Sequence, residues 1–541
     1  TTNSSVYFKE NKENPKELEF KNRINLPYEP GTDEEEIEEV MQAHKEFVPS
    51  RIVTTPFMTI LRERSYQESS IENLPFRSNF IYYVDQVLYA IQDLPDDKRP
   101  LKFNLKWDEA EQSRTKVQYF ILQSVLQAAV EAAANGVKKE NLTFNFSHPE
   151  AYNANHLRAF KRITRRAVNI GLADEKYKTQ EKTGFETESI SSALYFAKGQ
   201  EIPFTENVVT IDIGGGTSDL SIWQDTKLLW RNSFRLAGKD VLINYLTNNL
   251  TLIKEISGND DLLLESYQTL QSIKNNKSKL ANGIELLVNS PQFGEAFKNR
   301  FDIFTGKEKG KELKDLTELA LSGILYYVSQ VVNHLIESRV FKTGSSKSKT
   351  LRICLGGKAS TLYKVVFEDS DDQEGLSKMI EKVTDGIFTS IGIVFTDTPK
   401  HEVSYGLLVD KTGATDLDLT DRSHETVLGE DVMVAKSKVE IVSDLDPDKQ
   451  WRVKDISQLK TFLKFLQAYS RIPIKLTKKF EGDLEGKINA ELKNGQSRAL
   501  DLKRDMQSVE GDDSLAEIQK TTSIIEPVFI LGLKQVINEV T

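Results

Sequence analysis

The residues best suited to chemistry lie in one glycine-rich stretch near the middle of the chain. Residues 208–213 read Val-Val-Thr-Ile-Asp-Ile, and Gly214-Gly215-Gly216 follow directly. Three consecutive glycines let the backbone take positive φ and approach a ligand closely, so that several N–H groups face anionic oxygens. Asp212, at the end of the apolar run, is then placed to hold Mg²⁺ through water or to orient an attacking water. From these residues alone, an ordinary tight hairpin with a solvated aspartate is an equally good interpretation.

Other common site chemistries have no counterpart in the sequence. There is no Gly-x4-Gly-Lys-Ser/Thr loop, no Gly-x-Gly-x-x-Gly between a strand and a helix, and no Gly-x-Ser-x-Gly elbow. These absences argue against P-loop, Rossmann and hydrolase-triad mechanisms. The six histidines form no His-x3-His pair, so no structural metal is expected. The single cysteine, Cys354, lies in an apolar run and is interpreted as a buried, inert thiol.

The elements that position these residues alternate between strands and helices. Short apolar runs bounded by glycine predict strands, and apolar positions at helical spacing predict helices. The glycine triplet falls between two such strands and therefore forms the turn of a hairpin. The alternation predicts an α/β fold with mixed sheets covered by helices. Strands are expected at 142–146, 208–213, 220–223, 228–230 and 351–355, and helices from residue 117 to a stop at Gly136 and at 155–170.

Composition and charge narrow the classes of partner. The 541 residues include 71 Lys and Arg against 81 Asp and Glu, a net charge of −10, which argues against nucleic acid as a partner. One cysteine permits no internal disulfide, and the N-terminus has no secretory layout, so we expect a cytoplasmic protein without a membrane span. The basic side chains of the helix at 155–170 are interpreted as a solvated face. They are Arg158, Lys161, Arg162, Arg165 and Arg166.

Further motifs stand on either side of the segment Asp212-x-Gly-Gly-Gly-Thr-x-Asp219. In chain order they are Thr1-Thr2-Asn3-Ser4-Ser5-Val6, Val48-Pro49-Ser50, Ser147-His148-Pro149-Glu-Ala-Tyr152-Asn153, Thr187-Glu188-Ser-Ile-Ser-Ser-Ala193-Leu194, Leu236-Ala-Gly238-Lys-Asp240, Cys354-Leu355-Gly356-Gly357-Lys358 and Thr398-Pro399-Lys-His-Glu-Val403-Ser-Tyr405-Gly406. Together, this ordered set resembles the phosphate, connecting and adenosine motifs of the actin and seventy-kilodalton heat-shock chaperone ATPase superfamily. The resemblance covers residues 1 to about 410.

The resemblance implies a two-lobed actin-like ATPase fold, with ribonuclease-H-like lobes of mixed sheets, that holds ATP and Mg²⁺ between the lobes. Asp212 and Glu188 are the implied catalytic residues: they order metal-bound waters and position the base for hydrolysis, and Asp212 holds Mg²⁺ through water. A plain helix-start charge remains the alternative for Glu188, as does a simple strand-to-helix turn for Gly356 and Gly357. The implied nucleotide contacts are Thr1, Thr2, Asn3, Gly214, Gly215, Gly216, Thr217, Gly238, Lys274, Gly356 and Gly357.

Several positions depart from the family pattern. The Asp-x-Gly that precedes the first motif in the family is absent, so we expect the chain to begin inside that hairpin. Ser189 replaces a proline, and Gln271 replaces the glutamate that partners Lys274 in the family. The arginine that packs on adenine has only Lys358 or Ser360 as substitutes. Nucleotide binding is therefore better supported than fast hydrolysis.

The resemblance also divides the chain and suggests its role. Lobe I is expected at 1–200, lobe II at 201–398, a segment returning to lobe I at 399–412, and a mainly helical C-terminal extension at 413–541. The implied function is Mg-ATP binding with slow hydrolysis, in which nucleotide-dependent lobe closure controls a protein partner in a chaperone-like way. An ATP-dependent filament or scaffold that self-associates, a sugar or acid kinase, and a non-hydrolysing nucleotide sensor remain alternatives.

Overall fold

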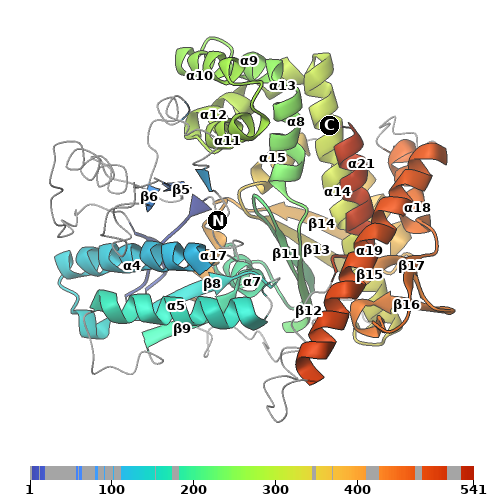
Figure 1. The fold of residues 1–541 in the computed structure, drawn as a ribbon, viewed down its shortest axis with the longest axis horizontal. Helices are drawn as coiled ribbons and strands as arrows, with labels where there is room; N and C mark the ends of the chain where they lie inside the picture. The colour runs from blue at the N-terminus through green and yellow to red at the C-terminus, as the bar shows by residue number, and fades with distance from the viewer. Residues whose placement is uncertain are drawn as a thin grey trace.

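A five-stranded mixed sheet lies in the middle of the structure, which is a computed structural model (Figure 1). Its strands follow the order β12-β11-β10-β13-β14. The first three are antiparallel neighbours, whereas β13 and β14 run parallel to β10. The strands are β10 (Asn207–Ile213), β11 (Ser218–Gln224), β12 (Lys227–Phe234), β13 (Thr350–Gly356) and β14 (Ser390–Phe395). The structure describes residues 3–10, 13–18, 57–58, 60–63, 79–82, 91, 101–102, 111–150, 152, 154–172, 182–343, 349–367, 370–409, 426–469, 478–507 and 525–540.

Both faces of this sheet are covered, which explains why its strands are apolar along their whole length. Every residue of β10 is buried. Val208 belongs to an apolar cluster with helix α7 (Glu188–Lys198), while Val209 and Ile211 belong to the cluster that contains helix α14 (Glu308–Glu337). The predicted strands of this sheet, the glycine hairpin and the α/β class with mixed sheets are thus confirmed.

Helix α14 is the long helix of the core. Of the helices in the described ranges, it is long and apolar enough to cross a membrane by length and composition, a property that we did not anticipate from the sequence. However, 78% of its most apolar 18-residue window is buried within the structure. Its apolar side chains pack against α21 and α16. We therefore interpret α14 as a core helix.

Shorter helices connect β12 to α14 and follow β13. The first of them, η3 (Lys239–Ile243), is a π-helical turn that begins directly after Gly238. The others are α8 (Asn244–Asn248), α9 (Thr251–Ser257), α10 (Asp261–Ser272), α11 (Lys277–Val288), α12 (Pro291–Asn299), α13 (Phe301–Thr305), α15 (Ser360–Val366), α16 (Ser370–Val383) and α17 (Glu402–Gly406).

The N-terminal part contributes a parallel strand pair and two packed helices. Strands β8 (Phe144–His148) and β9 (Thr183–Thr187) are parallel, and β9 leads directly into α7. Helices α4 (Glu111–Ala134) and α5 (Ala154–Leu172), both predicted from the sequence, pack through an apolar cluster. The remaining strands are β1 (Asn3–Ser4), β2 (Tyr7–Phe8), β3 (Lys16–Glu17), β4 (Phe57–Met58), β5 (Ile60–Glu63), β6 (Asn79–Tyr82) and β7 (Leu101–Lys102), with a 3₁₀ turn at Lys139–Asn141.

The C-terminal part is a mixed unit that shares its core with α14. Tyr326 of α14 stacks on Phe529 with ring centroids 5.2 Å apart, and the Tyr327 hydroxyl donates a hydrogen bond to the Val427 carbonyl oxygen at 3.0 Å. The elements of this part belong to the same apolar cluster as the central sheet. They are β15 (Val427–Val434), β16 (Ser437–Ile441), a 3₁₀ turn at Val442–Asp444, β17 (Trp451–Val453), α18 (Ser457–Tyr469), α19 (Lys478–Gln507) and α21 (Val528–Val540), with strand order β16-β15-β17.

The expected division of the chain into two lobes, a return segment and a C-terminal extension stays a prediction. The boundary between 412 and 413 lies outside the described residues. Helix α21, which follows this boundary in the sequence, packs against α14, which precedes it. The C-terminal part is therefore not an isolated appendage. It also contains a three-stranded sheet, whereas the sequence predicted a mainly helical extension.

Candidate functional site

The glycine loop after β10 is joined to the turn that precedes η3. The Gly214 N–H donates to the Thr217 carbonyl oxygen at 2.8 Å, which closes the hairpin. The Gly238 N–H donates to the Gly214 carbonyl oxygen at 3.2 Å, and the Lys239 N–H donates to that of Gly215 at 2.9 Å. The predicted Gly238 is therefore brought beside the predicted glycine triplet, although its own N–H group is used within the protein.

The turn after β13 reaches the same place. The Ala359 N–H donates to the Ile213 carbonyl oxygen at 3.0 Å. Gly357 has a φ of +83°, and a Cβ there would stand 2.2 Å from Asp212 Oδ1 and 2.4 Å from the Ile213 carbonyl oxygen. At Gly356 a Cβ would stand 3.2 Å from Glu402 Oε1. Packing inside the protein is thus enough to require glycine at 357, and the predicted approach of both glycines to ribose and adenine stays a prediction.

Gly215 and Gly216 differ from these packed glycines. Apart from the glycine itself and its two chain neighbours, no described atom lies within 4 Å of the point where a Cβ would stand on either residue. Neither has a positive φ, so the freedom of glycine to take positive φ is not used at these two positions. The loop therefore presents its backbone to open space without needing left-handed conformations, because the hydrogen bonds to Gly238 and Lys239 hold its shape.

Four buried carboxylates lie beside this loop. Asp212 is the last but one residue of β10 and stands opposite Asp219 of β11 in the strand register. Glu188 is the first residue of α7, and Glu402 is the first residue of α17. Their exposed fractions are 3%, 1%, 7% and 0%, respectively. The structure thus brings together the two predicted catalytic carboxylates and adds two that the sequence did not single out.

Lys400 supplies positive charge to this carboxylate cluster. Burial by itself lowers the pKa of Lys400, but attraction to Asp212, Glu188, Glu402 and Asp219 outweighs burial and raises the pKa above its usual value. Lys400 has a φ of +79°, a conformation that is strained for a residue with a side chain. Lys400 was not among the site residues predicted from the sequence.

The N-terminal segment anchors the turn that contains Lys400. The Ser5 hydroxyl donates to the Lys400 carbonyl oxygen at 3.0 Å, and the Ser404 hydroxyl donates to the Ser5 carbonyl oxygen at 3.0 Å. The Tyr7 hydroxyl lies 3.0 Å from His401 Nδ1. Residues separated by almost 400 positions along the chain therefore fix the backbone from which Lys400 projects.

Glu402 has a strongly perturbed carboxyl group. Burial raises its pKa above the usual value, and the negative charge of Asp212 raises it further. The Gly357 N–H donates to Glu402 Oε1 at 3.0 Å and opposes this shift without cancelling it. Asp212 and Glu402 therefore compete for charge, and a cation near them, such as the Lys400 ammonium, relieves that competition.

A polar network connects the start of α7 and Asp219 to the N-terminal part. Thr187 caps α7, since its hydroxyl accepts from the Ile190 N–H at 3.4 Å. The Ser189 hydroxyl donates to Glu150 at 2.7 Å. The Glu150 N–H in turn donates to Asp219 Oδ1 at 3.3 Å, and Arg231 pairs with the Glu150 carboxylate at 3.4 Å. Ser189, noted as a departure from the family pattern, thus has a defined polar role.

The structure gives less support to the remaining predicted nucleotide contacts. Thr1 and Thr2 lie outside the described residues, and Asn3 lies in β1, which pairs with β4. Thr217 is buried and its hydroxyl donates to Asp219 at 3.4 Å. Lys274 is exposed in the turn between α10 and α11, and no described contact joins it to the glycine loops.

Lys358 is a second partly buried lysine close to the site. Burial lowers its pKa to about 8, and the nearby charge of Lys400 contributes in the same direction. Its ammonium donates to the carbonyl oxygen and the side-chain Oδ1 of Asn289, both at 3.1 Å. The Ser360 hydroxyl donates to the Gly357 carbonyl oxygen at 2.7 Å. Both candidate substitutes for the adenine-packing arginine thus have partners within the protein.

The carboxylates are not arranged as a direct metal cage. In the described part of the chain, no three His, Cys, Asp or Glu side chains are grouped closely enough to ligate one ion. Mg²⁺ usually keeps several waters and takes one or two carboxylates plus substrate phosphates. A donor set led by Asp212 therefore fits a Mg²⁺ that arrives with a phosphate ligand better than a permanently bound ion.

No protein-family model matches the chain, and no curated protein matches its sequence. The solved structure of ethanolamine utilization protein EutJ from Carboxydothermus hydrogenoformans is similar with a TM-score of 0.26 and 10% sequence identity, over 57% of this chain and 79% of that chain. A likeness at this level does not define the fold of this chain.

Proposed function

We propose that this chain binds Mg-ATP at the ends of β10 and β13, and that nucleotide-dependent closure of its two lobes controls a protein partner. One observation carries the proposal: three turns, after residues 213, 237 and 355, meet beside a cluster of buried carboxylates. The motifs in these turns are the ones that resemble the phosphate and adenosine motifs of the actin-like ATPases. A sheet of three antiparallel strands continued by two parallel ones agrees with the mixed sheet expected of lobe II.

The proposed roles follow from placement. The backbone N–H groups of the loop around Gly215 and Gly216, where the positions of a Cβ face open space, bind phosphate oxygens. Asp212 and Glu188 order the waters of the bound Mg²⁺ and orient an attacking water. When bound, Mg²⁺ supplies charge stabilisation to the phosphates. Because these carboxylates also interact with the Lys400 ammonium, we propose slow rather than fast hydrolysis.

The proposal is tested by nucleotide binding and phosphate release with matched carboxylate variants. Asp212→Asn and Glu188→Gln remove one charge each from the cluster, whereas Asp397→Asn removes one from an exposed position near Lys400. We expect the first two to lower phosphate release by about a hundredfold, and the third to leave it unchanged. Absence of measurable ATP binding by the parent chain, with titration calorimetry in Mg²⁺, would overturn the proposal.

A second candidate function, a nucleotide sensor that does not hydrolyse ATP, is favoured by Lys400. The Lys400 ammonium neutralises part of the negative charge of the four carboxylates, which would otherwise attract a metal ion. A sensor is expected to bind ATP equally well with Mg²⁺ and with EDTA, and to release no phosphate. Binding that is abolished by EDTA would favour the hydrolytic function instead.

A further inference from the structure

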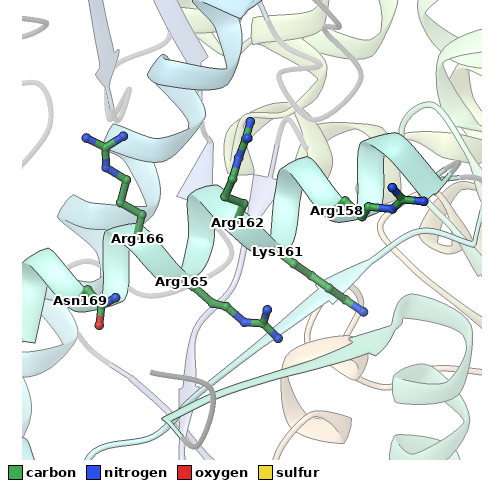
Figure 2. A pocket seen from close by; sticks show the side chains of 6 residues that line it. All are labelled: Arg158, Lys161, Arg162, Arg165, Arg166 and Asn169. Atoms are coloured by element: carbon green, nitrogen blue, oxygen red, sulfur yellow. The ribbon is translucent and has the colours of Figure 1, made fainter. Parts of the chain in front are cut away.

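Helix α5 carries a strip of positive charge on its outer face. Five cations and one amide line a hollow of about 400 Å³ along this helix (Figure 2). Arg158, Arg162 and Arg166 form one row, with a repeat of four residues or about 6 Å. Lys161, Arg165 and Asn169 form a parallel row. In Figure 2 the side chains of Arg162 and Arg166 leave the helix on one side, and those of Lys161 and Arg165 leave it on the other.

These cations are not accounted for by ion pairs within the described part of the chain. None of the five pairs there with a carboxylate, and Arg165 Nε is buried without a hydrogen-bond partner among the described residues. Arg165 and Lys161 lie over the Phe185 ring, at 5.5 and 5.8 Å from its centroid. Phe185 therefore holds one row in place, while Arg162 and Arg166 stay exposed.

The charge and packing around the strip favour some classes of anionic partner over others. Once these five charges are taken from the net −10, the rest of the chain carries −15. A long polyanion such as nucleic acid, whose protein partners usually neutralise about 6–10 phosphates, would extend past the strip into this repulsion. An anionic membrane would need several apolar side chains to insert, but the apolar face of α5, with Ala167 and Val168, is buried against α4, and within the described part of α5 Ile170 alone is a large exposed apolar side chain.

We propose that the face of α5 formed by Arg158, Lys161, Arg162, Arg165 and Arg166 is a docking site for an acidic segment of a partner protein. The strip is about 12 Å long. Carboxylates on one side of an extended peptide recur every 6.6–6.8 Å or so, and those at every fourth position of a helix recur about every 6 Å. Either spacing matches the rows, and guanidinium groups bind carboxylates through paired hydrogen bonds. The inference is independent of the nucleotide site.

Binding of a fluorescein-labelled octaglutamate peptide to the full chain tests this proposal by fluorescence anisotropy at low salt. We expect saturable binding that weakens as salt increases, and no binding of octaglutamine. Arg162→Ala/Arg166→Ala removes two exposed cations from the strip and is expected to weaken binding about tenfold. Lys254→Ala/Lys311→Ala changes the net charge equally at exposed lysines of α9 and α14 and is expected to leave binding unchanged.

Three results would overturn the proposal. The first is equal peptide affinity of the arginine variant and the parent, with folding of both verified by circular dichroism. The second is an equal loss in the lysine control, which would show that only net charge matters. The third is tighter binding of a 20-nucleotide single strand or of phosphatidylserine vesicles than of octaglutamate, which would assign the strip to nucleic acid or to a membrane.

Discussion

Replacing Gly216 by alanine distinguishes a glycine kept for a ligand from a glycine kept for the fold. Beyond Gly216 and its two chain neighbours, no described atom lies within 4 Å of the position where the new methyl group would stand, and φ at Gly216 is not positive. Alanine therefore fits, and its smaller loss of backbone entropy stabilises the protein by up to about 1 kcal/mol. If phosphate lies over this loop, the methyl group obstructs it. We expect ATP affinity to fall about 10- to 100-fold, or about 1.4–2.7 kcal/mol.

Gly357 gives the opposite expectation. Its φ of +83° costs an alanine about 1–2 kcal/mol. The methyl group would also stand 2.2 Å from Asp212 Oδ1 and 2.4 Å from the Ile213 carbonyl oxygen, and relieving such overlap costs about 1–3 kcal/mol more. Gly357→Ala is thus expected to lower the free energy of unfolding by about 2–5 kcal/mol and to displace Asp212.

Urea denaturation and titration calorimetry with Mg-ATP measure both quantities for each variant. Gly486→Ala, on α19, serves as control, because its methyl group also meets no described atom and lies in the C-terminal part. It should gain about 0.5–1 kcal/mol of stability with unchanged ATP affinity. Unchanged ATP affinity in Gly216→Ala would refute the assignment of the loop to phosphate. Marked unfolding of Gly216→Ala would instead refute the open space that the structure places there.

The remaining predictions concern one buried carboxylate, Glu430, and two partly buried lysines, Lys400 and Lys534. Lys400→Met leaves four carboxylates without their cation, so we expect a loss of about 3–5 kcal/mol and a melting temperature that Mg²⁺ raises in the variant but not in the parent, as measured by thermal denaturation. Burial raises the pKa of Glu430 from 4.5 to about 8 in the folded state, so its charging destabilises the fold progressively as pH rises between these values. Glu430→Gln should therefore flatten the dependence of unfolding free energy on pH from 5 to 8; an unchanged slope contradicts this. Lys534 of α21 pairs with Asp240 at 3.6 Å, and burial raises the pKa of Asp240. Lys534→Ala should cost about 1–3 kcal/mol, with a deficit that grows as rising pH deprotonates Asp240, because only charged Asp240 needs the lysine; a deficit that does not change with pH would exclude this role.

Local patterns were sufficient to predict the central sheet. The strand at 208–213, the glycine turn and the strand after it follow from side-chain alternation and from glycine, which act over a few residues. The same holds for the helix at 155–170, which is found at Ala154–Leu172. Asp212 and Glu188 were also accessible from sequence, since each stands at the end or start of a predicted element within a recognisable motif.

Other features depend on contacts between distant parts of the chain. Glu402 and Lys400 join the cluster because the turn before α17 returns to the end of β10, almost 190 residues later in the sequence, and no local pattern encodes that meeting. The apolar run of α14 resembles a membrane span until its burial is known. The packing of α21 on α14 likewise connects segments that the sequence treats separately.

The sequence by itself thus determined the strands, the glycine turns and two carboxylates, because backbone preference and side-chain periodicity are local properties. Only the tertiary structure decided that Gly357 is required by Asp212, that Gly216 faces open space, and that Lys400 supplies charge to four carboxylates. Burial and charge pairing depend on which atoms from distant segments share a small volume. Such proximity arises from the packing of the whole chain.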